Sequence, residues 1–440
     1  MEHKIKNLVV CSTLNQITNF IIIDMYKPEN IFNITFDDNA VERFNFNIKP
    51  RKWDEYLKKE CENFKCSWSD VKLSIEYIHN LGKLKNKLEM QIVRKACGEI
   101  YWHVTGGQRT IALAVSKLIG DKETKREKDK LIYVEGNTEE LIVNNCDGEI
   151  IPNGNLNYRK KDLTFEQALN LTGFDTKNLE STIEFKKKGN KIHENDVNFI
   201  KEHKFYQKLY NFIVEDESKN KGHEIIKFES ENRKYEGSFR NLLLYSNKIE
   251  KSTSRYECVE ELFKQFMEKH KDIKEIKYDI LSSKEIEGSY PAGYVFEKLA
   301  AHRIYNIVKD NPKVIEMVRS LKTYFNKKNK DDNSRHNIID ELDVVLLTDT
   351  GKIINFECKS SGMKSDNAKS NKYTTYRLAG VFGMPVLLSP LLEYEIKDNE
   401  NSDDDLKSQK KAVRAAKAAE LEVMGLDKLN EENFEKLFNI

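Results

Sequence analysis

Apolar runs alternate with longer amphipathic stretches through the first 145 residues of the chain. Five of these runs are rich in β-branched or aromatic residues and have the length of strands: Asn7–Ser12, Ile31–Phe36, Leu73–Ile78, Glu99–Val104 and Leu131–Glu135. Because helix-length segments separate them, the strands are expected to form a parallel sheet with helices on its faces. We therefore predict an α/β domain over residues 1–145.

The rest of the chain falls into two further parts. Residues 146–280 show mostly helical patterns, such as Thr164–Leu171 and Asp196–Val214, interrupted by lysine-rich stretches, and we interpret them as a helical linker region. Residues 281–440 return to mixed α/β order, which predicts a second α/β domain. Its expected elements are the helices Gly293–Lys309, Tyr373–Ala379 and Asp405–Ala419, the hairpin Ile338–Lys359, and the strands Val386–Ser389 and Leu421–Met424.

Composition narrows the class of protein. Of the 440 residues, 39% are apolar and 33% are charged, which is typical of a folded, heavily charged globular protein. The net charge of +1 means that any contact with nucleic acid must come from a local patch. The seven cysteines are scattered without a CxxC pair, as in a reduced cytoplasmic protein. The longest apolar stretch, Val381–Leu392, is shorter than the ~20 residues that span a bilayer, so we expect no membrane partner.

The predicted hairpin places two carboxylates opposite each other. If Asp349–Gly351 is a three-residue loop with its glycine in the left-handed conformation, Thr348 faces Lys352. Counting back along both strands then puts Asp343 directly opposite Glu357. Their Cβ atoms would lie roughly 4.5–5.5 Å apart on one face of the hairpin. A divalent cation can bridge carboxylates at this separation.

The chemistry that these residues suggest is phosphodiester hydrolysis. Hard oxygen ligands favour Mg²⁺ or Mn²⁺, and a cation offsets the repulsion between two neighbouring carboxylates. Lys359 shares the face of Glu357, where it can orient an attacking water, whereas Ile354, Phe356 and Cys358 point into a core. Alternatively, the charged face is a solubilising feature of an edge hairpin. Four consecutive apolar residues after Asp343 favour a buried hairpin and therefore a functional site.

These residues resemble the PD-(D/E)xK nucleases, and in particular the CARF-domain ancillary nucleases of type III CRISPR systems, the Card/Can branch. The segment Gly293–Glu297 resembles the family's G-x-x-[LF]-E helix, which adds Glu297; the alternative is a solvent-facing glutamate. The resemblance implies a Rossmann-like CARF domain followed by a restriction-endonuclease-like domain over 281–440. It implies the catalytic residues Glu297, Asp343, Glu357 and Lys359, and the ligands of Mg²⁺ or Mn²⁺ Glu297, Asp343, Glu357 and Cys358.

Helix residues after the hairpin are further candidates. Lys372, Tyr376 and Arg377 follow Lys359 on the next predicted helix, where they would contact substrate phosphates. Ordinary helix surface charge is the alternative interpretation.

Two turns after predicted strands have the residues that a phosphate ligand needs. Ser12–Gln16 follows the first strand, and Thr105–Thr110 follows a later strand with two glycines before a helix start. The second turn fits neither the dinucleotide fingerprint nor the Walker A pattern, and turn chemistry alone is the alternative. Together the two turns resemble the CARF domain. That resemblance implies a homodimer that binds cyclic oligoadenylate, most often cyclic tetraadenylate, through Ser12, Thr13, Asn15, Gln16, Thr105, Gly106, Gly107, Gln108, Arg109 and Thr110.

The resemblance also suggests roles within this set. Asn15 and Gln16 would meet ribose or adenine edges, and Thr110 would meet phosphate through the first helical turn. The phosphodiester would lie against Gly106, Gly107 and Arg109, with Asn137 as a further candidate.

Three functions remain open at this point. The first is a homodimeric endonuclease of antiviral defence that cyclic oligoadenylate activates to cleave single-stranded DNA, RNA or plasmid DNA. The second is a stand-alone restriction or repair endonuclease whose front domain recognises DNA. The third is a non-catalytic nucleotide-binding regulator that retains the nuclease fold.

Overall fold

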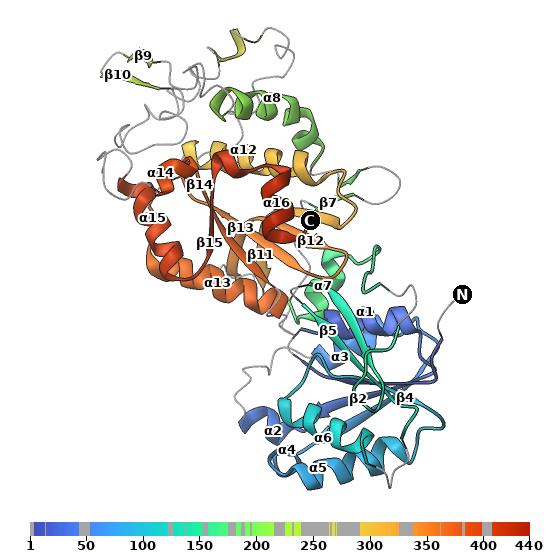
Figure 1. Ribbon diagram of the computed structural model, residues 1–440. Coiled ribbons are helices and arrows are strands. Elements are labelled where there is room, and N and C mark those ends of the chain that lie inside the picture. The colour runs from blue at the N-terminus through green and yellow to red at the C-terminus, as the bar shows by residue number, and fades with distance from the viewer. Residues whose placement is uncertain are drawn as a thin grey trace, which may run out of the picture.

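The protein is built from two α/β lobes, as Figure 1 shows. The computed structural model describes residues 4–13, 15–43, 53–121, 126–136, 138–152, 157–174, 182–185, 190–193, 196–214, 225–230, 233–238, 264, 266–268, 270, 291–324, 338–360, 362–380, 383–397 and 407–440. Among these residues, no helix has the length and apolar character needed to cross a membrane.

The first lobe contains a six-stranded sheet in the order β3-β2-β1-β4-β5-β6. Its strands are β1 (Asn7–Cys11), β2 (Asn30–Phe36), β3 (Ser67–Leu73), β4 (Ile100–His103), β5 (Lys130–Glu135) and β6 (Glu140–Asn144). The pairs among β1 to β5 are parallel, and β6 adds an antiparallel edge that the sequence analysis did not predict. The expected parallel α/β sheet is therefore confirmed.

Helices cover both faces of this sheet. One core joins the sheet to α4, α5 and α6, and another joins the opposite face to α1, α3 and α7. The bounds of the helices are α1 (Ile17–Tyr26), α2 (Asp38–Arg43), α3 (Trp53–Glu60), α4 (Ile75–His79), α5 (Leu81–Leu88), α6 (Arg109–Ile119) and α7 (Phe165–Leu171).

The predicted strand Leu73–Ile78 was wrong. Strand β3 ends at Leu73, and α4 begins directly after Ser74. The apolar signal of β3 was weak because this edge strand buries only Val71 and Leu73. The other four predicted strands of this lobe, which correspond to β1, β2, β4 and β5, begin and end within a few residues of their predicted bounds.

The second lobe contains a mixed seven-stranded sheet in the order β15-β14-β13-β12-β11-β7-β8. Strands β11 and β12 form an antiparallel pair, as do β12 and β13, whereas β13, β14 and β15 run parallel. The strands are β7 (Thr182–Glu184), β8 (Lys191–Ile192), β11 (Val314–Tyr324), β12 (Ile338–Thr348), β13 (Ile353–Cys358), β14 (Met384–Ser389) and β15 (Glu422–Gly425).

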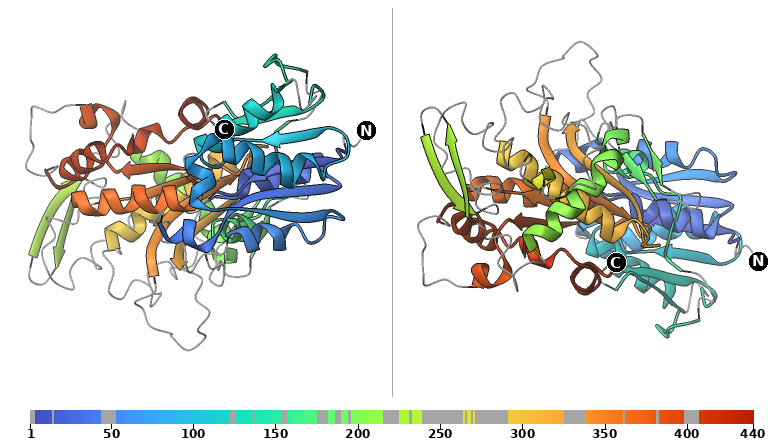
Figure 2. Two further views of the ribbon diagram at one scale, coloured as in Figure 1. Left: turned by 90° about the horizontal axis from the view of Figure 1, so that it is seen from below. Right: turned by 90° about the horizontal axis from the view of Figure 1, so that it is seen from above.

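Side chains of β12 and β13 alternate between two cores. Val344, Leu346 and Phe356 pack with α8, α12 and α16, whereas Val345 and Ile353 pack with α1, α7 and the end of α13. Figure 2 shows the helices of this lobe on both sides of its sheet. Their bounds are α8 (Val197–Val214), α12 (Pro291–Val308), α13 (Ser365–Ala379), α14 (Glu393–Lys397), α15 (Lys407–Ala418) and α16 (Glu431–Phe438).

Within the segment 146–280, α7 packs on the first lobe, whereas later described parts join the second lobe. Strand β7 pairs with β11, and α8 packs on α12, where Lys298 forms an ion pair with Glu202 at 2.7 Å. A separate hairpin, β9 (Ile225–Ser230) and β10 (Arg233–Ser238), is also present. The predicted helices of this segment are confirmed as α7 and α8. The domain division at residues 145 and 280 stays a prediction.

The two lobes share one of their cores. Ile17, Phe20 and Ile21 of α1 belong to the same buried cluster as Val345 and Ile353 of the second sheet. Helix α1 therefore packs its apolar side against the strands that form the predicted catalytic hairpin. This contact determines where the functional residues of the two lobes lie relative to each other.

Candidate functional site

The hairpin β12–β13 has the predicted register. Its ladder pairs Val344 with Phe356 and Leu347 with Ile353, so the next step places Asp343 opposite Glu357. Gly351 adopts a left-handed φ of 79°, and its N–H donates to the carbonyl of Thr348 at 3.0 Å. The four apolar residues after Asp343 are fully buried, as expected for a strand covered on both faces.

Cys358 meets the carboxylates through its backbone. Its N–H donates to Oδ2 of Asp343 at 2.6 Å. The thiol packs in the hydrophobic core, and burial raises its pKa well above the usual range, so it stays protonated. Any contribution of Cys358 to a metal site would therefore come from its main chain.

Three half-buried carboxylates lie near one another at the hairpin, away from its turn. Burial raises the pKa of Asp343 well above its usual value, and the nearby charges of Glu357 and Glu297 raise it further. Glu297 reaches this point from α12. Burial raises its pKa too, against the opposing effect of a hydrogen bond from Ser320 Oγ at 3.2 Å. The structure thus brings Glu297 to the hairpin that the sequence identified separately.

Lys359 completes the group from the same face of β13. Its ammonium forms an ion pair with Oε1 of Glu357, and its side chain remains 30% exposed. Burial favours the neutral amine, but the carboxylates of Asp343 and Glu357 outweigh this effect and raise the pKa of Lys359. The side chain is therefore a charged donor at neutral pH.

Two polar residues that the sequence analysis missed support these carboxylates. Ser320, which binds Glu297, has a left-handed φ of 50°, an uncommon conformation for a residue with a side chain. Asn371 of α13 donates to Oε2 of Glu357 at 2.9 Å. Asn371 is buried, and its Oδ1 atom has no hydrogen-bond partner among the described residues. No spacing rule connects these two positions to the hairpin, since they come from β11 and α13.

The donor chemistry of the site suits a hard divalent cation. Glu297, Asp343 and Glu357 offer carboxylate oxygens, and the raised pKa of Asp343 reports crowded negative charge that a cation would relieve. As the side chains stand, no group of three or more His, Cys, Asp or Glu residues among those described is arranged to hold an ion.

The candidate phosphate contacts on α13 lie on its outer side. Lys372 forms a hydrogen bond with Glu420 at 2.5 Å, and its ammonium lies 5.8 Å from the ring centre of Tyr376. The guanidinium of Arg377 lies 5.3 Å from the ring centre of Tyr373. Pairing of this kind accords with the surface-charge interpretation of these residues.

In the first lobe, the two predicted ligand turns touch each other. They follow β1 and β4, which are neighbouring parallel strands. A methyl group on Gly106 would overlap the side chain of Thr13, and one on Gly107 would lie 2.8 Å from Cβ of Cys11. Only glycine allows the second turn to approach the first this closely, and Gly107 also has a left-handed φ of 91°.

Ser12 and Gln16 point into the protein. Ser12 Oγ lies within hydrogen-bonding distance of Asp54 and Asn33, and Gln16 Nε2 donates to Oδ1 of Asp54 at 3.1 Å. Gln16 is fully buried and Ser12 nearly so. These two side chains brace the first turn against α3. Burial raises the pKa of Asp54, which the sequence analysis did not identify.

A buried histidine links the two turns. His103 Nδ1 lies 2.8 Å from Oδ1 of Asn19, and Nε2 lies 2.9 Å from the hydroxyl of Thr105. Asn19 uses its amide group to donate to Gln16 and Cys11, so its oxygen accepts from His103 and Nε2 of the ring is left as an acceptor. Burial lowers the pKa of His103 to about 3, which keeps the ring neutral.

The last residues of the second turn lead into the start of α6. Helix α6 begins at Arg109, and Gln108 provides no side-chain cap for the first N–H groups. Gly107 and Arg109 are exposed. The hydroxyl of Thr110 is buried without a hydrogen-bond partner in the described part of the chain. A helix start without a side-chain cap, a cation and an unpaired hydroxyl make this position suitable for a phosphate group. Asn137 lies outside the described residues.

Comparisons with known proteins identify the fold. The sequence matches no protein-family model and no curated protein. The structure is similar to protein VC1899 from Vibrio cholerae, with a TM-score of 0.59, 13% identity and coverage of 99% of this chain and 98% of that one. It is also similar to Can2 from Sulfobacillus thermosulfidooxidans in complex with cyclic tetra-adenylate, with a TM-score of 0.55, 13% identity and coverage of 100% and 98%. The expected two-domain fold is confirmed.

Proposed function

We propose that this protein is a metal-dependent nuclease of type III CRISPR antiviral defence that cyclic tetraadenylate activates. The observation that carries the proposal is the group formed by Asp343, Glu357 and Lys359 on one hairpin with Glu297 delivered from α12. This group lies in a fold that matches Can2, which was solved with cyclic tetra-adenylate, over the whole chain. The likeness supports the proposal through the fold alone.

The nuclease site would act as follows. Glu297, Asp343, Glu357 and the main chain of Cys358 would hold Mg²⁺ or Mn²⁺, which supplies activation of a water molecule and neutralises charge on the phosphate. Lys359 is charged, so it acts as a donor to the water or to the developing phosphate charge and not as a base. Asn371 and Lys359 hold the two oxygens of Glu357 in one orientation.

The sensor would bind its ligand at the turns after β1 and β4. Gly106, Gly107, Arg109 and Thr110 would receive the phosphodiester through the start of α6. Thr13, Asn15, Thr105 and Gln108 would line the site beside them. Ser12 and Gln16, which are buried, shape the first turn instead of meeting the bases directly. Residues 1–145 then form the sensor, 146–280 the linker and 281–440 the nuclease.

A homodimer in the cytoplasm is part of the proposal. Cyclic tetraadenylate has two-fold symmetry, which suits two identical sensor lobes around one ligand. Ligand binding would favour the subunit arrangement in which the nuclease lobes engage single-stranded DNA, RNA or plasmid DNA.

A nuclease assay with the full-length protein tests the proposal. Wild type and Asp343→Asn are incubated with Mn²⁺ or EDTA, with and without cyclic tetraadenylate, on single-stranded DNA, single-stranded RNA and plasmid DNA. We expect cleavage only when wild type, Mn²⁺ and ligand are combined. Cyclic triadenylate and cyclic hexaadenylate, run in parallel, test the ring size.

Other outcomes favour the alternative functions. Duplex cleavage at a defined sequence at equal rate without ligand indicates a stand-alone endonuclease. Ligand binding without cleavage of any substrate indicates a non-catalytic regulator. In that case Glu357→Ala should also leave the activity unchanged.

A further inference from the structure

The first turn of α1 touches two separate elements of the nuclease lobe. Ile17 packs against Gly351 in the turn of the β12–β13 hairpin so closely that a methyl group on Gly351 would overlap Cγ2 of Ile17. Ile21, one helical turn later, lies 3.4 Å from the same position. Helix α1 thus contacts the turn that connects β12, the strand of Asp343, to β13, the strand of Glu357.

The second contact joins the ligand turn to the end of α13. A methyl group on Gly380, just after the last residue of α13, would lie 3.5 Å from Cβ of Asn15. Asn15 is tied to α1, because its Oδ1 accepts from the N–H of Ile17 at 2.9 Å. Both contacts therefore involve a segment of three consecutive residues that a side-chain hydrogen bond ties together.

These two nuclease elements converge again on Glu357. The residue lies on β13, six positions after Gly351, which corresponds to about 20 Å along a strand. Its Oε2 atom accepts from Asn371 of α13, nine positions before Gly380 and about 14 Å along a helix. The β12–β13 hairpin and α13 each contact the sensor at one end. Further along, β13 carries Glu357, and α13 binds its carboxylate through Asn371.

From this arrangement we propose that residues 15–17 are the coupling element through which bound ligand controls the orientation of Glu357. The inference rests on the proposed function, which it extends to regulation. A rotation of the first turn of α1 would shift β13 and α13 by different amounts. Ile17 contacts the turn before β13, whereas Asn15 contacts the end of α13. The hydrogen bond between Asn371 and Glu357 spans these two elements and would respond to that shift.

The start of the coupling element lies at the ligand site. The hydroxyl of Thr13 donates to the carbonyl of Asn15, and the side chain of Thr13 packs against Gly106 in the second ligand turn. Gln16 is fixed through its N–H to the carbonyl of Leu171 at 3.1 Å and through its side chain to Asp54. A ligand that separates or closes the two turns would therefore act directly on Asn15.

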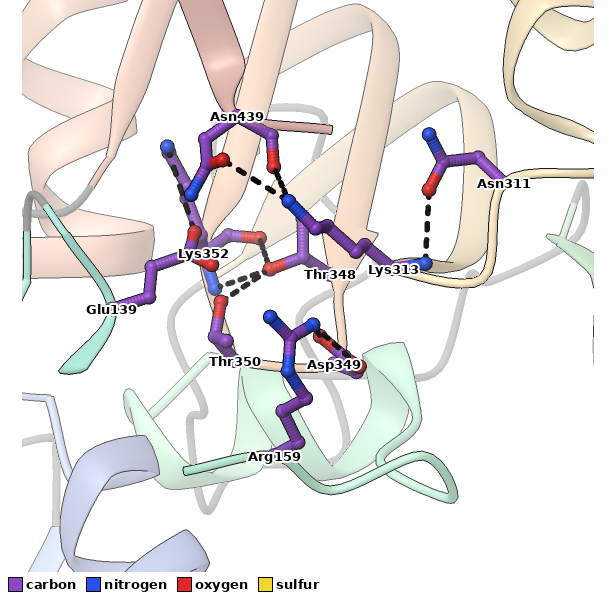
Figure 3. Close-up of polar contacts among 9 residues, drawn as sticks. All are labelled: Glu139, Arg159, Asn311, Lys313, Thr348, Asp349, Thr350, Lys352 and Asn439. Atoms are coloured by element: carbon purple, nitrogen blue, oxygen red, sulfur yellow. Dashed lines mark hydrogen bonds and ion pairs between the residues drawn. The ribbon is translucent and has the colours of Figure 1, made fainter. Parts of the chain in front are cut away.

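Ion pairs and hydrogen bonds hold the hairpin turn in place. Arg159 donates to both oxygens of Asp349 at 3.0 and 3.1 Å, and the N–H of Lys160 donates to the carbonyl of Asp349 at 2.6 Å. Lys352 pairs with Glu139 at 3.7 Å and donates to the carbonyl of Phe438 at 2.9 Å. Figure 3 shows Arg159 beside Asp349 and Lys352 beside Glu139. Because the turn is buried and held on both sides, displacement is transmitted along the strands.

The test uses two substitutions of one residue. Ile17→Leu removes the Cγ2 methyl that contacts Gly351 but keeps the side-chain volume, whereas Ile17→Val keeps that branch and loses only the terminal carbon. For Ile17→Leu we expect an affinity for cyclic tetraadenylate within about threefold of wild type and a ligand-stimulated cleavage about tenfold lower. Ile17→Val should stay close to wild type in both. Full stimulation of Ile17→Leu would overturn the inference.

Hydrogen exchange separates this inference from the proposed function. In wild type, cyclic tetraadenylate should change the exchange of residues 349–359 and 371–380, and Ile17→Leu should lose this change. Absence of the change in ligand-bound wild type overturns the coupling, whether or not the protein cleaves nucleic acid. If the exchange changes but no substrate is cleaved, the coupling is supported and the proposed nuclease activity fails. Circular dichroism verifies that both variants are folded.

Discussion

The carboxylate of Asp343 combines the catalytic role that we propose with a cost in stability. Burial and two neighbouring carboxylates raise its pKa in the folded protein well above the usual value. Ionising this residue therefore opposes folding, and the opposition is complete above the folded-state pKa and absent below about pH 4, near the unfolded value. Function and stability are expected to diverge at this position.

Asp343→Asn should accordingly abolish cleavage and raise thermal stability. The amide oxygen can still accept the N–H of Cys358, while the partly buried negative charge is gone. In EDTA at pH 8 we expect a midpoint about 2–4 °C above wild type, with the difference disappearing below about pH 4. Thermal unfolding across this pH range measures it. A lower midpoint at pH 8 would contradict the assignment of a buried, crowded charge.

Asn371 is expected to position Glu357. Removing its amide leaves Oε2 of Glu357 without that donor, so Asn371→Ala should lower cleavage about 10- to 100-fold and raise the Mn²⁺ concentration needed for half-maximal rate. Asn367→Ala, an exposed asparagine on the same helix, is the matched control and should change neither. An unchanged Mn²⁺ requirement in Asn371→Ala would argue against a positioning role.

At the scale of elements, the close approach between the hairpin turn and α1 depends on Gly351. Gly351 and Gly148 have similar left-handed φ values of 79° and 83°, but only Gly351 has neighbours within 4 Å of an added methyl group. Both alanine substitutions incur the backbone strain, and Gly351→Ala also overlaps Ile17.

We therefore expect Gly351→Ala to destabilise the protein by about 1–3 kcal/mol more than Gly148→Ala. Urea unfolding of the two variants measures the difference. Equal midpoints would show that the hairpin turn does not press on α1 in solution.

The predicted and observed elements also show which sequence patterns were informative about secondary structure. The hairpin β12–β13 was predicted down to its register, because the turn residues and the alternation of side chains are local properties. Helix α13 begins at Ser365, eight residues before the predicted start at Tyr373, because its first two turns are polar and carry little hydrophobic periodicity. Strand β11 was missed because its apolar residues come in the adjacent pairs Val314–Ile315 and Met317–Val318 and do not alternate with polar ones.

For the whole molecule, the proposal predicts one ligand for two chains. Light scattering should give a dimer of the 51.5 kDa chain, and calorimetry should give a stoichiometry of about 0.5 cyclic tetraadenylate per chain. Arg109→Ala should weaken binding without dissociating the dimer, because the exposed guanidinium contacts ligand phosphate in the proposal. Lys117→Ala, an exposed cation later on α6, is the control. A stoichiometry of one ligand per chain would contradict the shared site.

The sequence alone determined the α/β class of both lobes, the hairpin and the pairing of Asp343 with Glu357. These features follow from side-chain periodicity and turn geometry over short stretches of chain. Only the tertiary structure decided that Ser320 and Asn371 support the carboxylates and that Gln16 faces inward. It also decided that residues 15–17 contact the turn of the β12–β13 hairpin and the end of α13. These contacts join segments that are far apart in the chain, and their geometry is fixed by packing in shared cores, which no local pattern encodes.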